Sequence, residues 1–304
     1  SLNIGDAATG GLNVGNVSFQ NVTGTTTLYG GTGTLSVNSN AAVLTATTAD
    51  IFLKANGFSF GSNATIGGTG APGSAANLAG IATVGATVGV AGGAGTVQLP
   101  LSTLSQFSAS RLQIGDDATG TVTVNAINTS GQSYGSAGLI LDSATGIVVD
   151  GNITTAGTIA IVGPTTLNVS PTLTAPSGTT FSGNVDGAKV LTMVGGLTTV
   201  SGSLGSFTPL AGLDLSASSG INATGSISLD GFAPGASASG LNLTGLTTVS
   251  LTGGGTISGY TTGNGILVSS GGLLGATVSG FTLTGNQRGM LFESGSYAGS
   301  TVSN

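Results

Sequence analysis

The sequence predicts an all-β fold, a single-stranded parallel β-helix (β-solenoid) with about 22–25 residues per coil. Three observations predict it. Val, Ile, Leu and Thr are spread evenly along the 304 residues, and such residues favour strands. Glycine occurs 57 times and, together with Asn and Asp, separates the short apolar segments with turns. Finally, sequence segments return at fixed offsets, which is typical of stacked coils.

The clearest repeat lies in the segment 256–304, where two separate pieces return at an offset of 24. GILV at 265–268 returns as GMLF at 289–292, and ATVSG at 276–280 returns as STVSN at 300–304. Equivalent positions of successive coils should stack, so inward positions should stay apolar. The expected stacked pairs are Ile266 with Met290, Val268 with Phe292, Val278 with Val302, Ile257 with Val278, and Tyr260 with Phe281.

Longer offsets repeat as well. LNIGDAATG at residues 2–10 returns as LQIGDDATG at 112–120, with seven of nine positions the same and an offset of 110. A looser match relates 28–33 to 141–146 at an offset of 113. GLTTVS at 196–201 returns at 245–250, and this offset of 49 is about two coils. A β-sandwich would not readily explain these matches.

The elements follow in chain order. Short strands are expected at residues 2–4, 12–14, 25–29, 34–37, 42–45 and 51–53. Loops are expected at 67–77 and 231–240, and one helical turn with Ser102 as N-cap, or a bulging coil, at 99–110. Without a linker long enough to divide it, the chain should form a single solenoid domain over 1–304, with about 12 to 14 coils.

The composition excludes several classes of function. Without Cys and His, the chain has no disulfides and lacks the usual zinc, copper and haem ligands, so no cofactor is expected. The net charge is −6, and the four basic residues are far apart in sequence, which argues against nucleic-acid binding. Residues 78–95 are too poor in large aliphatic side chains for a membrane span, and no signal peptide is recognisable.

The repeated LNIGDAATG/LQIGDDATG segment, the TVTV at 121–124 and the Gly/Thr/Ser/Val-rich composition resemble secreted exoproteins of the filamentous-haemagglutinin type. This resemblance implies two-partner secretion and a right-handed β-helix at the bacterial surface with adhesive, biofilm or fibre roles. The family's N-terminal secretion domain is not recognisable, so the chain would be an internal or C-terminal piece or a divergent relative. GNGI and ATVSGFTLTGN in the tail also resemble pectate-lyase-like β-helix repeats.

Enzymatic chemistry has little support in the sequence. Asp116-Asp117 is the only adjacent acidic pair and is similar to the paired aspartates of polygalacturonase-like enzymes. The further acid motif, the Gly-His-Gly and the Arg-x-Lys of those enzymes are missing. We expect Asp116 to form an Asx turn after Gly115, as Asp6 would after Gly5, and we expect no catalytic residues.

Four aspartates form a candidate calcium site, because carboxylate oxygens are the ligands that Ca²⁺ prefers. They are Asp116, Asp117, Asp142 and Asp150. The calcium β-roll motif is absent, and these residues are more simply interpreted as solvated turn residues. The sequons at Asn16 and Asn152 are likewise interpreted as corner residues.

Taken together, the sequence predicts an extracellular, non-enzymatic structural or adhesive β-solenoid segment of a bacterial surface fibre. Open solenoid ends expose strand edges, so the chain is expected to continue covalently or to stack end to end with copies of itself. Surface glycans are potential partners. A carbohydrate-binding or carbohydrate-active β-helix is the first alternative. An ice- or polysaccharide-binding Thr array, using residues 25–27, 198–199 and 247–248, is the second.

Overall fold

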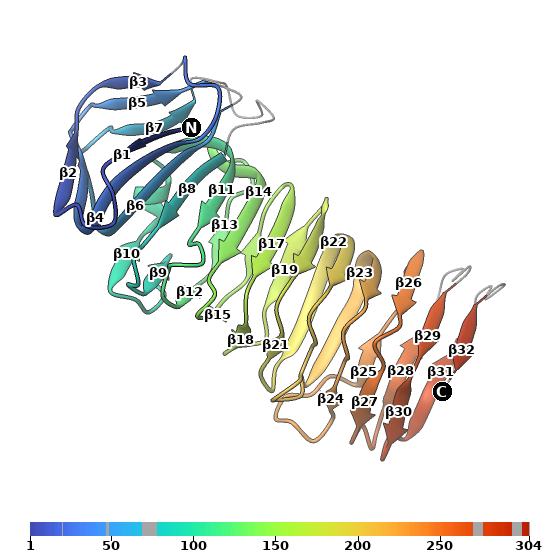
Figure 1. The fold of residues 1–304 in the computed structure, drawn as a ribbon. Coiled ribbons are helices and arrows are strands. Elements are labelled where there is room, and N and C mark those ends of the chain that lie inside the picture. The colour runs from blue at the N-terminus through green and yellow to red at the C-terminus, as the bar shows by residue number, and fades with distance from the viewer. Residues whose placement is uncertain (20, 47–48, 69–77, 270–275, 294–299, 304) are drawn as a thin grey trace. The chain divides into compact units, whose positions relative to one another are not determined.

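The computed structural model describes residues 1–304 except 20, 47–48, 69–77, 270–275, 294–299 and 304. It is nearly all-β, and its parallel strands stack into a β-solenoid of about 11 turns (Figure 1). The number of turns is lower than expected because some turns are longer than expected. For example, the ladder partners Ala79 and Leu112 are one turn apart at an offset of 33. No helix among the described residues is long and apolar enough to cross a membrane.

The described chain divides into two compact units, and the expected single domain stays a prediction. The first contains Ser1–Val148 and Thr154–Gly157, and the second contains Val149–Ile153 and Thr158–Asn304. The elements of the first are β1 Leu2–Ile4, β2 Gly11–Val14, β3 Val17–Phe19, β4 Thr26–Val37, β5 Ala42–Thr45, β6 Ile51–Phe60, β7 Thr65–Gly68, β8 Leu78–Ala82, β9 Val88–Val90, β10 Val97–Leu99, α1 Leu101–Leu104, β11 Phe107–Ile114, β12 Val122–Val124, β13 Ile127–Asn128 and β14 Tyr134–Asp142. Strands β15 Ile147–Val149 and β16 Ile153–Thr154 include residues of both units.

In the first unit, the repeat at an offset of 110 coincides with the register of the main sheet. Strands β1, β4, β6, β8 and β11 pair in parallel, one per turn. The successive partners are Leu2, Thr26, Ile51, Ala79 and Leu112. Leu2 and Leu112 therefore occupy the same column of the ladder, four turns apart.

The looser repeat at an offset of 113 follows a second column of the same sheet. The residues of this column are all 1% exposed or less. They are Leu28, Leu53, Ile81, Ile114 and Leu141. Each side chain packs on its equivalent one turn away, at about the 4.8 Å spacing of neighbouring strands. Both long-range repeats are thus four-turn repeats, and the aliphatic column they define is the core of this unit.

Several element boundaries differ from the sequence-based expectation. Residues 25–29 and 34–37 do not form separate strands, because β4 runs through both and its register shifts around Gly31. Strand β6 likewise extends beyond Leu53 to Phe60. The expected helical turn exists as α1, but its N-cap is Pro100, not Ser102, and no side chain caps it. The expected loop at 67–77 lies mostly outside the described residues.

One face of the first unit extends only a short way past α1. Strands β3, β5 and β7 form a second parallel face, and in the described residues β7 continues it only to Phe107 and Ser108 of β11. The helical turn α1 precedes this short pairing and buries Leu104 completely. Phe107 is also fully buried, and its ring meets the edge of Phe60 at 5.9 Å between centroids.

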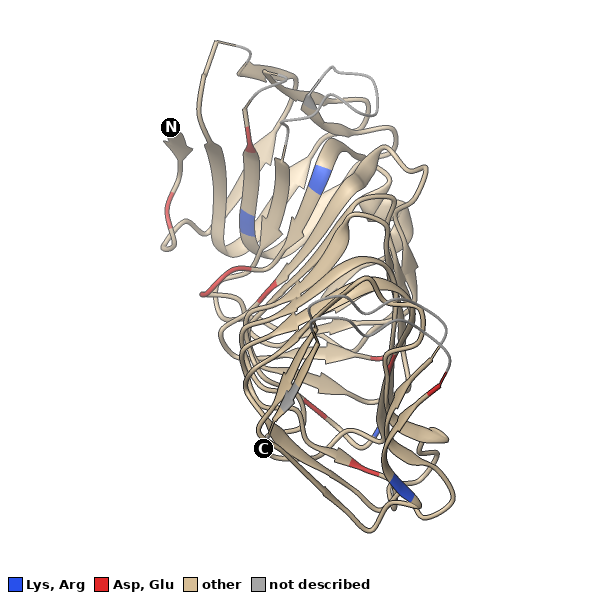
Figure 2. Ribbon diagram, turned by 90° about the vertical axis from the view of Figure 1, so that its right-hand side faces the viewer, with Lys and Arg blue, Asp and Glu red and all other residues tan. Residues whose placement is uncertain are grey.

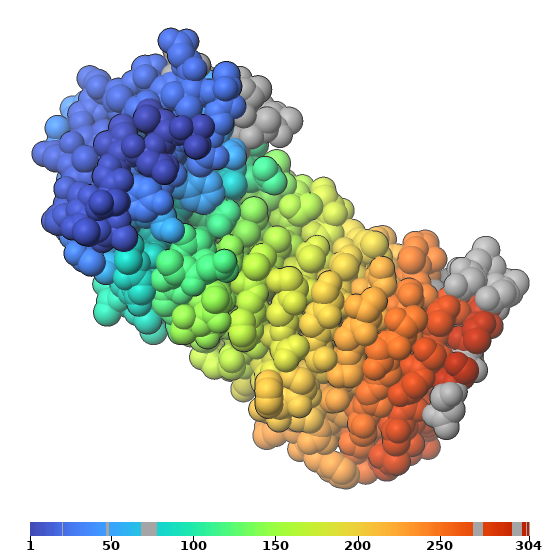
Figure 3. Space-filling view, in the orientation of Figure 1, coloured from blue at the N-terminus to red at the C-terminus, as the bar shows by residue number. Residues whose placement is uncertain are grey.

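The second unit stacks in the same way, as the colour bands of Figure 3 show. Its tail confirms the offset of 24: Ile266 pairs with Met290, Val268 with Phe292, and Val278 with Val302. Its strands are β17 Thr158–Val162, β18 Thr165–Leu167, β19 Thr172–Ala175, β20 Gly178–Phe181, β21 Val185–Asp186, β22 Val190–Val200, β23 Gly212–Ala223, β24 Leu229–Asp230, β25 Ser239–Asn242, β26 Thr248–Leu251, β27 Gly255–Ser258, β28 Asn264–Val268, β29 Thr277–Ser279, β30 Phe281–Thr284, β31 Arg288–Phe292 and β32 Thr301–Ser303.

Two of the expected stacked pairs are wrong. Ile257 pairs with Leu229 and Leu283 rather than with Val278, because β27 belongs to a different face from β29. Phe281 pairs with Gly255 rather than with Tyr260. Similar apolar sequences on two faces of one coil thus produced a false alignment.

The repeat at an offset of 49 is real, but its register is displaced by two positions. Val200 pairs with Ala223 and Ala223 with Leu251, so ladder partners two turns apart have an offset of 51. The displacement is even, and side chains alternate between faces with a period of two. Val200 and Val249 therefore both point inward, although they do not stack on each other.

Candidate functional site

The acidic motif at residues 116–117 forms a corner of the solenoid. Gly115 has φ +88°, a left-handed conformation that favours glycine, and Asp116 follows it. The Asp116 Oδ1 atom accepts hydrogen bonds from the Ala118 N–H at 3.1 Å and from the Thr119 hydroxyl at 3.0 Å. The Asp116 N–H donates to the Thr119 Oγ1 at 3.1 Å. The expected Asx turn after Gly115 is confirmed.

The same corner occurs in the first turn. Gly5 has φ +82°, and Asp6 Oδ1 accepts from the Ala8 N–H at 3.0 Å and from the Thr9 hydroxyl at 3.2 Å. The two copies differ in burial, because Thr119 is 1% exposed and its Oγ1 also accepts from the Thr83 N–H at 3.2 Å. The repeated segment is therefore explained by turn geometry.

Lys54 contacts the second copy of this corner. Its Nζ forms an ion pair with Asp116 Oδ2, and both side chains are about four-fifths buried, at 18% and 22% exposed. The ammonium also lies 5.9 Å from the centroid of the Tyr29 ring, within the range of a cation–π contact. The Lys54 ammonium thus occupies the Oδ2 side of the Asp116 carboxylate.

Asp142 lies one turn later, next to Gly115. The pKa of Asp142 is raised above its ordinary value, first by burial and then by the negative charges of Asp117 and Asp116. Asp142 Oδ2 accepts a long hydrogen bond of 3.4 Å from the Gln113 side chain, while Oδ1 is buried without a hydrogen-bond partner. These three aspartates are close enough for their charges to interact.

The fourth aspartate of the candidate calcium site, Asp150, follows β15 and belongs to the second unit. Asp117 is exposed on the corner. Within the described residues, no group of three or more His, Cys, Asp or Glu is arranged to hold a metal ion. The chain has only four basic residues, and Figure 2 shows the Lys and Arg positions as separate blue segments of the ribbon.

The Thr segments expected to give an ice-binding array do not form one. Thr26, Thr27 and Thr198 are buried, so their hydroxyls do not face solvent. Thr199 lies two turns from Ser250, not from Thr248, because of the displaced register. This correction removes the observation on which the Thr-array interpretation depended.

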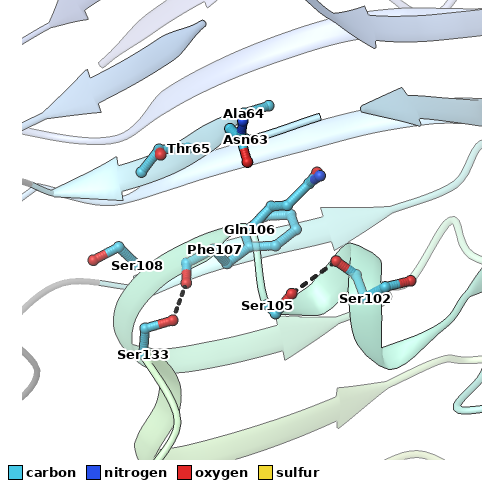
Figure 4. A pocket seen from close by; sticks show the side chains of 9 residues that line it. All are labelled: Asn63, Ala64, Thr65, Ser102, Ser105, Gln106, Phe107, Ser108 and Ser133. Carbon is cyan, nitrogen blue, oxygen red and sulfur yellow. Dashed lines mark hydrogen bonds between the residues drawn. The ribbon is translucent and has the colours of Figure 1, made fainter. Parts of the chain in front are cut away.

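A polar pocket of about 520 Å³ lies in the first unit, where its second face ends (Figure 4). Residues of three segments line it: the corner before β7, α1 with the residues after it, and the loop before β14. Phe107, whose side chain is fully buried, is the one aromatic residue among those that line it. The hydroxyl and amide side chains are those of Asn63, Thr65, Ser102, Ser105, Gln106, Ser108 and Ser133.

Sequence reasoning missed this pocket. The available signal was the loss of strand-like alternation at residues 99–110, which by itself predicts only a helical turn or a bulging coil. An irregular segment between two regular coils interrupts the stacking and leaves space beside it. The residues that line the space are mostly Ser, Thr, Asn and Gln, which occur throughout the chain and therefore do not mark a site.

The fold and the corners define the class of this protein: it is a parallel β-solenoid repeat protein. Comparison with protein-family models, curated proteins and solved structures found no match. Its function must therefore be inferred from its own residues.

Proposed function

We propose that the chain is a non-enzymatic, extracellular structural or adhesive segment of a bacterial surface fibre, of the filamentous-haemagglutinin type. The observation that carries this proposal is the turn-to-turn ladder with its aliphatic columns, such as Leu28 to Leu141. Such a ladder is stable through nearest-neighbour contacts, without metals or disulfides. The resemblance of the repeated segments to that family supports the surface location.

Location is tested in a bacterium that carries the gene. Antibodies against the chain should decorate intact cells, and added protease should remove the signal without lysis. A signal that appears only after lysis would contradict the proposal. A periplasmic marker protein, which must stay protected from the protease, controls for leaky cells.

The side chains of the acidic corner support a non-enzymatic role. Asp116 is engaged by Lys54 and by its own corner, so its carboxylate is not free to act as a general base. A glycosidase needs two carboxylates that face one cleft. Incubation with neutral and acidic polysaccharides should release no new reducing ends. Release that Asp116→Asn abolishes would establish an enzyme instead.

Self-assembly through strand edges belongs to the same proposal. Leu2 and Ile4 on β1 are each 36% exposed, and Phe292 on β31 is 45% exposed. Apolar edge strands favour pairing with further strands, from the same chain or from a second copy. Charged residues on an edge strand oppose such pairing.

We therefore expect the purified chain to form filaments in electron micrographs, and Ile4→Lys to shorten or abolish them. Leu101→Lys is the matched control, because Leu101 is 45% exposed but lies on α1. Uniform dispersed particles of the unchanged chain would contradict self-assembly. Equal effects of the two variants would show that charge alone, not the edge, is responsible.

A further inference from the structure

The pocket beside α1 ends a ladder of asparagine side chains. Asn40 and Asn63 occupy equivalent corners of successive turns, with φ +57° and +58°. The Asn63 Nδ2 donates to the Asn40 Oδ1 at 3.1 Å. The amide oxygen of Asn63 therefore faces away from Asn40, toward the pocket (Figure 4). This oxygen can accept a hydrogen bond where the side-chain amide of a third asparagine would donate if the ladder continued by one turn.

Two serines of the pocket also present acceptors. The Ser105 hydroxyl donates to the Ser102 carbonyl oxygen at 2.8 Å, and the Ser133 hydroxyl donates to the Phe107 carbonyl oxygen at 2.9 Å. A hydroxyl has one proton and two lone pairs, so each of these oxygens keeps acceptor capacity only. The dashed lines in Figure 4 show both bonds at the rim.

Gln106 adds a further unmet acceptor. Its Nε2 donates to the Gly61 carbonyl oxygen at 3.1 Å, and its Oε1 is buried without a partner. A buried acceptor without a partner destabilises the unbound protein. A ligand donor reaches this oxygen only when the amide shifts toward the pocket, and the new hydrogen bond would relieve that penalty.

The pocket is uncharged, because no Asp, Glu, Lys or Arg lines it. Its volume of about 520 Å³ is in the ordinary range for small-molecule sites. The neutral hydroxyl and amide acceptors around this pocket suit a neutral ligand with many hydroxyl donors. We propose that this pocket binds a saccharide unit of a neutral glycan. The inference deepens the proposed adhesive function and rests on it for its biological meaning.

The binding experiment uses the full chain labelled with ¹⁵N and follows the side-chain amide signals of Asn63 and Gln106. The probes are cellotriose, mannobiose, galactobiose and diacetylchitobiose. Digalacturonate and potassium chloride serve as charged probes. We expect at least one neutral probe to shift both amide signals in a saturable way. A pocket that responds to no neutral probe, or only to a charged one, would overturn the proposal.

Matched variants locate the effect. Ser105→Leu should weaken binding of the responding probe at least tenfold, because Ser105 is exposed and lines the pocket. Ser62→Leu should leave binding unchanged, because Ser62 is an exposed serine beside Asn63 that does not line the pocket. Equal affinities of the two variants would place the binding elsewhere and overturn the site.

The saccharide site and the proposed surface role can be rejected independently of each other. If cells display the chain while the pocket ignores all neutral probes, the surface role stands and the saccharide site is rejected. If the pocket binds a neutral probe but the chain stays inside cells, the site stands and the surface role is rejected.

Discussion

At the residue scale, polar corner side chains complete the hydrogen bonding between turns. Asn16 Oδ1 accepts from the Ala42 N–H at 2.8 Å, and Asn152 Oδ1 accepts from the Thr172 N–H at 2.8 Å. Each bond joins one turn to the next at a point where the strand ladder is interrupted. The interpretation of these two asparagines as corner residues is confirmed, and the corner residues contribute to stacking as well as to turning.

Removing the Thr119 hydroxyl should test how much one corner contributes. Thr119→Val keeps the shape but leaves the Asp116 and Thr83 N–H groups without their acceptor. We expect a loss of about 2 to 4 kcal/mol in unfolding free energy, since each buried unsatisfied donor costs about 1–3 kcal/mol. Thr9→Val, in the more exposed copy, should lose less than half as much. Equal losses in urea unfolding would show that burial of the corner does not matter.

The raised pKa of Asp142 predicts a dependence of stability on pH. The folded state holds the Asp142 proton more tightly than the unfolded state, so this group contributes most at acid pH. Its contribution is lost as the pH rises from the ordinary Asp value of 3.8 through the raised folded value. Asp142→Asn should remove this decline and make the chain more stable at neutral pH.

The measurement is urea unfolding of both proteins at several values between about pH 3 and 7. Asp117→Asn is the control, because it removes one of the neighbouring charges but leaves the burial of Asp142 unchanged. It should reduce the decline without abolishing it. Parallel curves for the original chain and Asp142→Asn would contradict the assigned cause.

At the element scale, the register between strands is set by which side chains face inward and not by the best sequence match. GLTTVS aligns with its repeat at an offset of 49, whereas β22, β23 and β26 stack at an offset of 51. Both registers place valine inward, so hydrophobicity alone does not distinguish them. The lengths of the corners between these strands determine which register forms, and the match between the two GLTTVS segments does not reveal those lengths.

Paired cysteines should report this register directly, because the chain has no Cys of its own. Asn222→Cys with Ser250→Cys joins direct ladder partners and should form a disulfide in air. Asn222→Cys with Thr248→Cys follows the sequence match and places the residues too far apart for a bond. Mass spectrometry of the oxidised, monomeric variants separates the two outcomes. Preferential cross-linking of the second pair would show that the register of β23 and β26 is different.

At the scale of the whole molecule, stability comes from apolar columns and backbone ladders with few charges. Only 5% of the residues are charged, and no cysteine is present.

The fold class was predictable from the sequence, since repeats of apolar and turn residues specify stacking. The pocket was not, because it depends on where stacking fails near α1 and on which Ser and Asn side chains happen to converge there. The interaction of Lys54 with Asp116 was equally hidden, because the two residues lie far apart in the sequence and no repeat relates them.

Salt, metal chelators and reducing agents should therefore have little effect at a fixed pH. We expect the thermal midpoint to change by less than about 3 °C between about 0.05 and 0.5 M NaCl, because surface charge pairs contribute little. EDTA or a reducing agent should leave it unchanged. A fall in the midpoint with EDTA would show a bound metal ion and would revive the calcium interpretation.

The unequal turns of the first unit have a practical meaning. The column from Leu2 to Leu112 keeps its register although the offsets between its successive members grow from 24 to 25, then to 28 and 33. In the longest of these turns, the extra chain length includes β10 and α1, while the rungs stay in place. At Gly131, with φ +76°, no atom lies near the position of an added side chain. Such a corner is a natural place to graft a foreign peptide, which would make this solenoid a display scaffold.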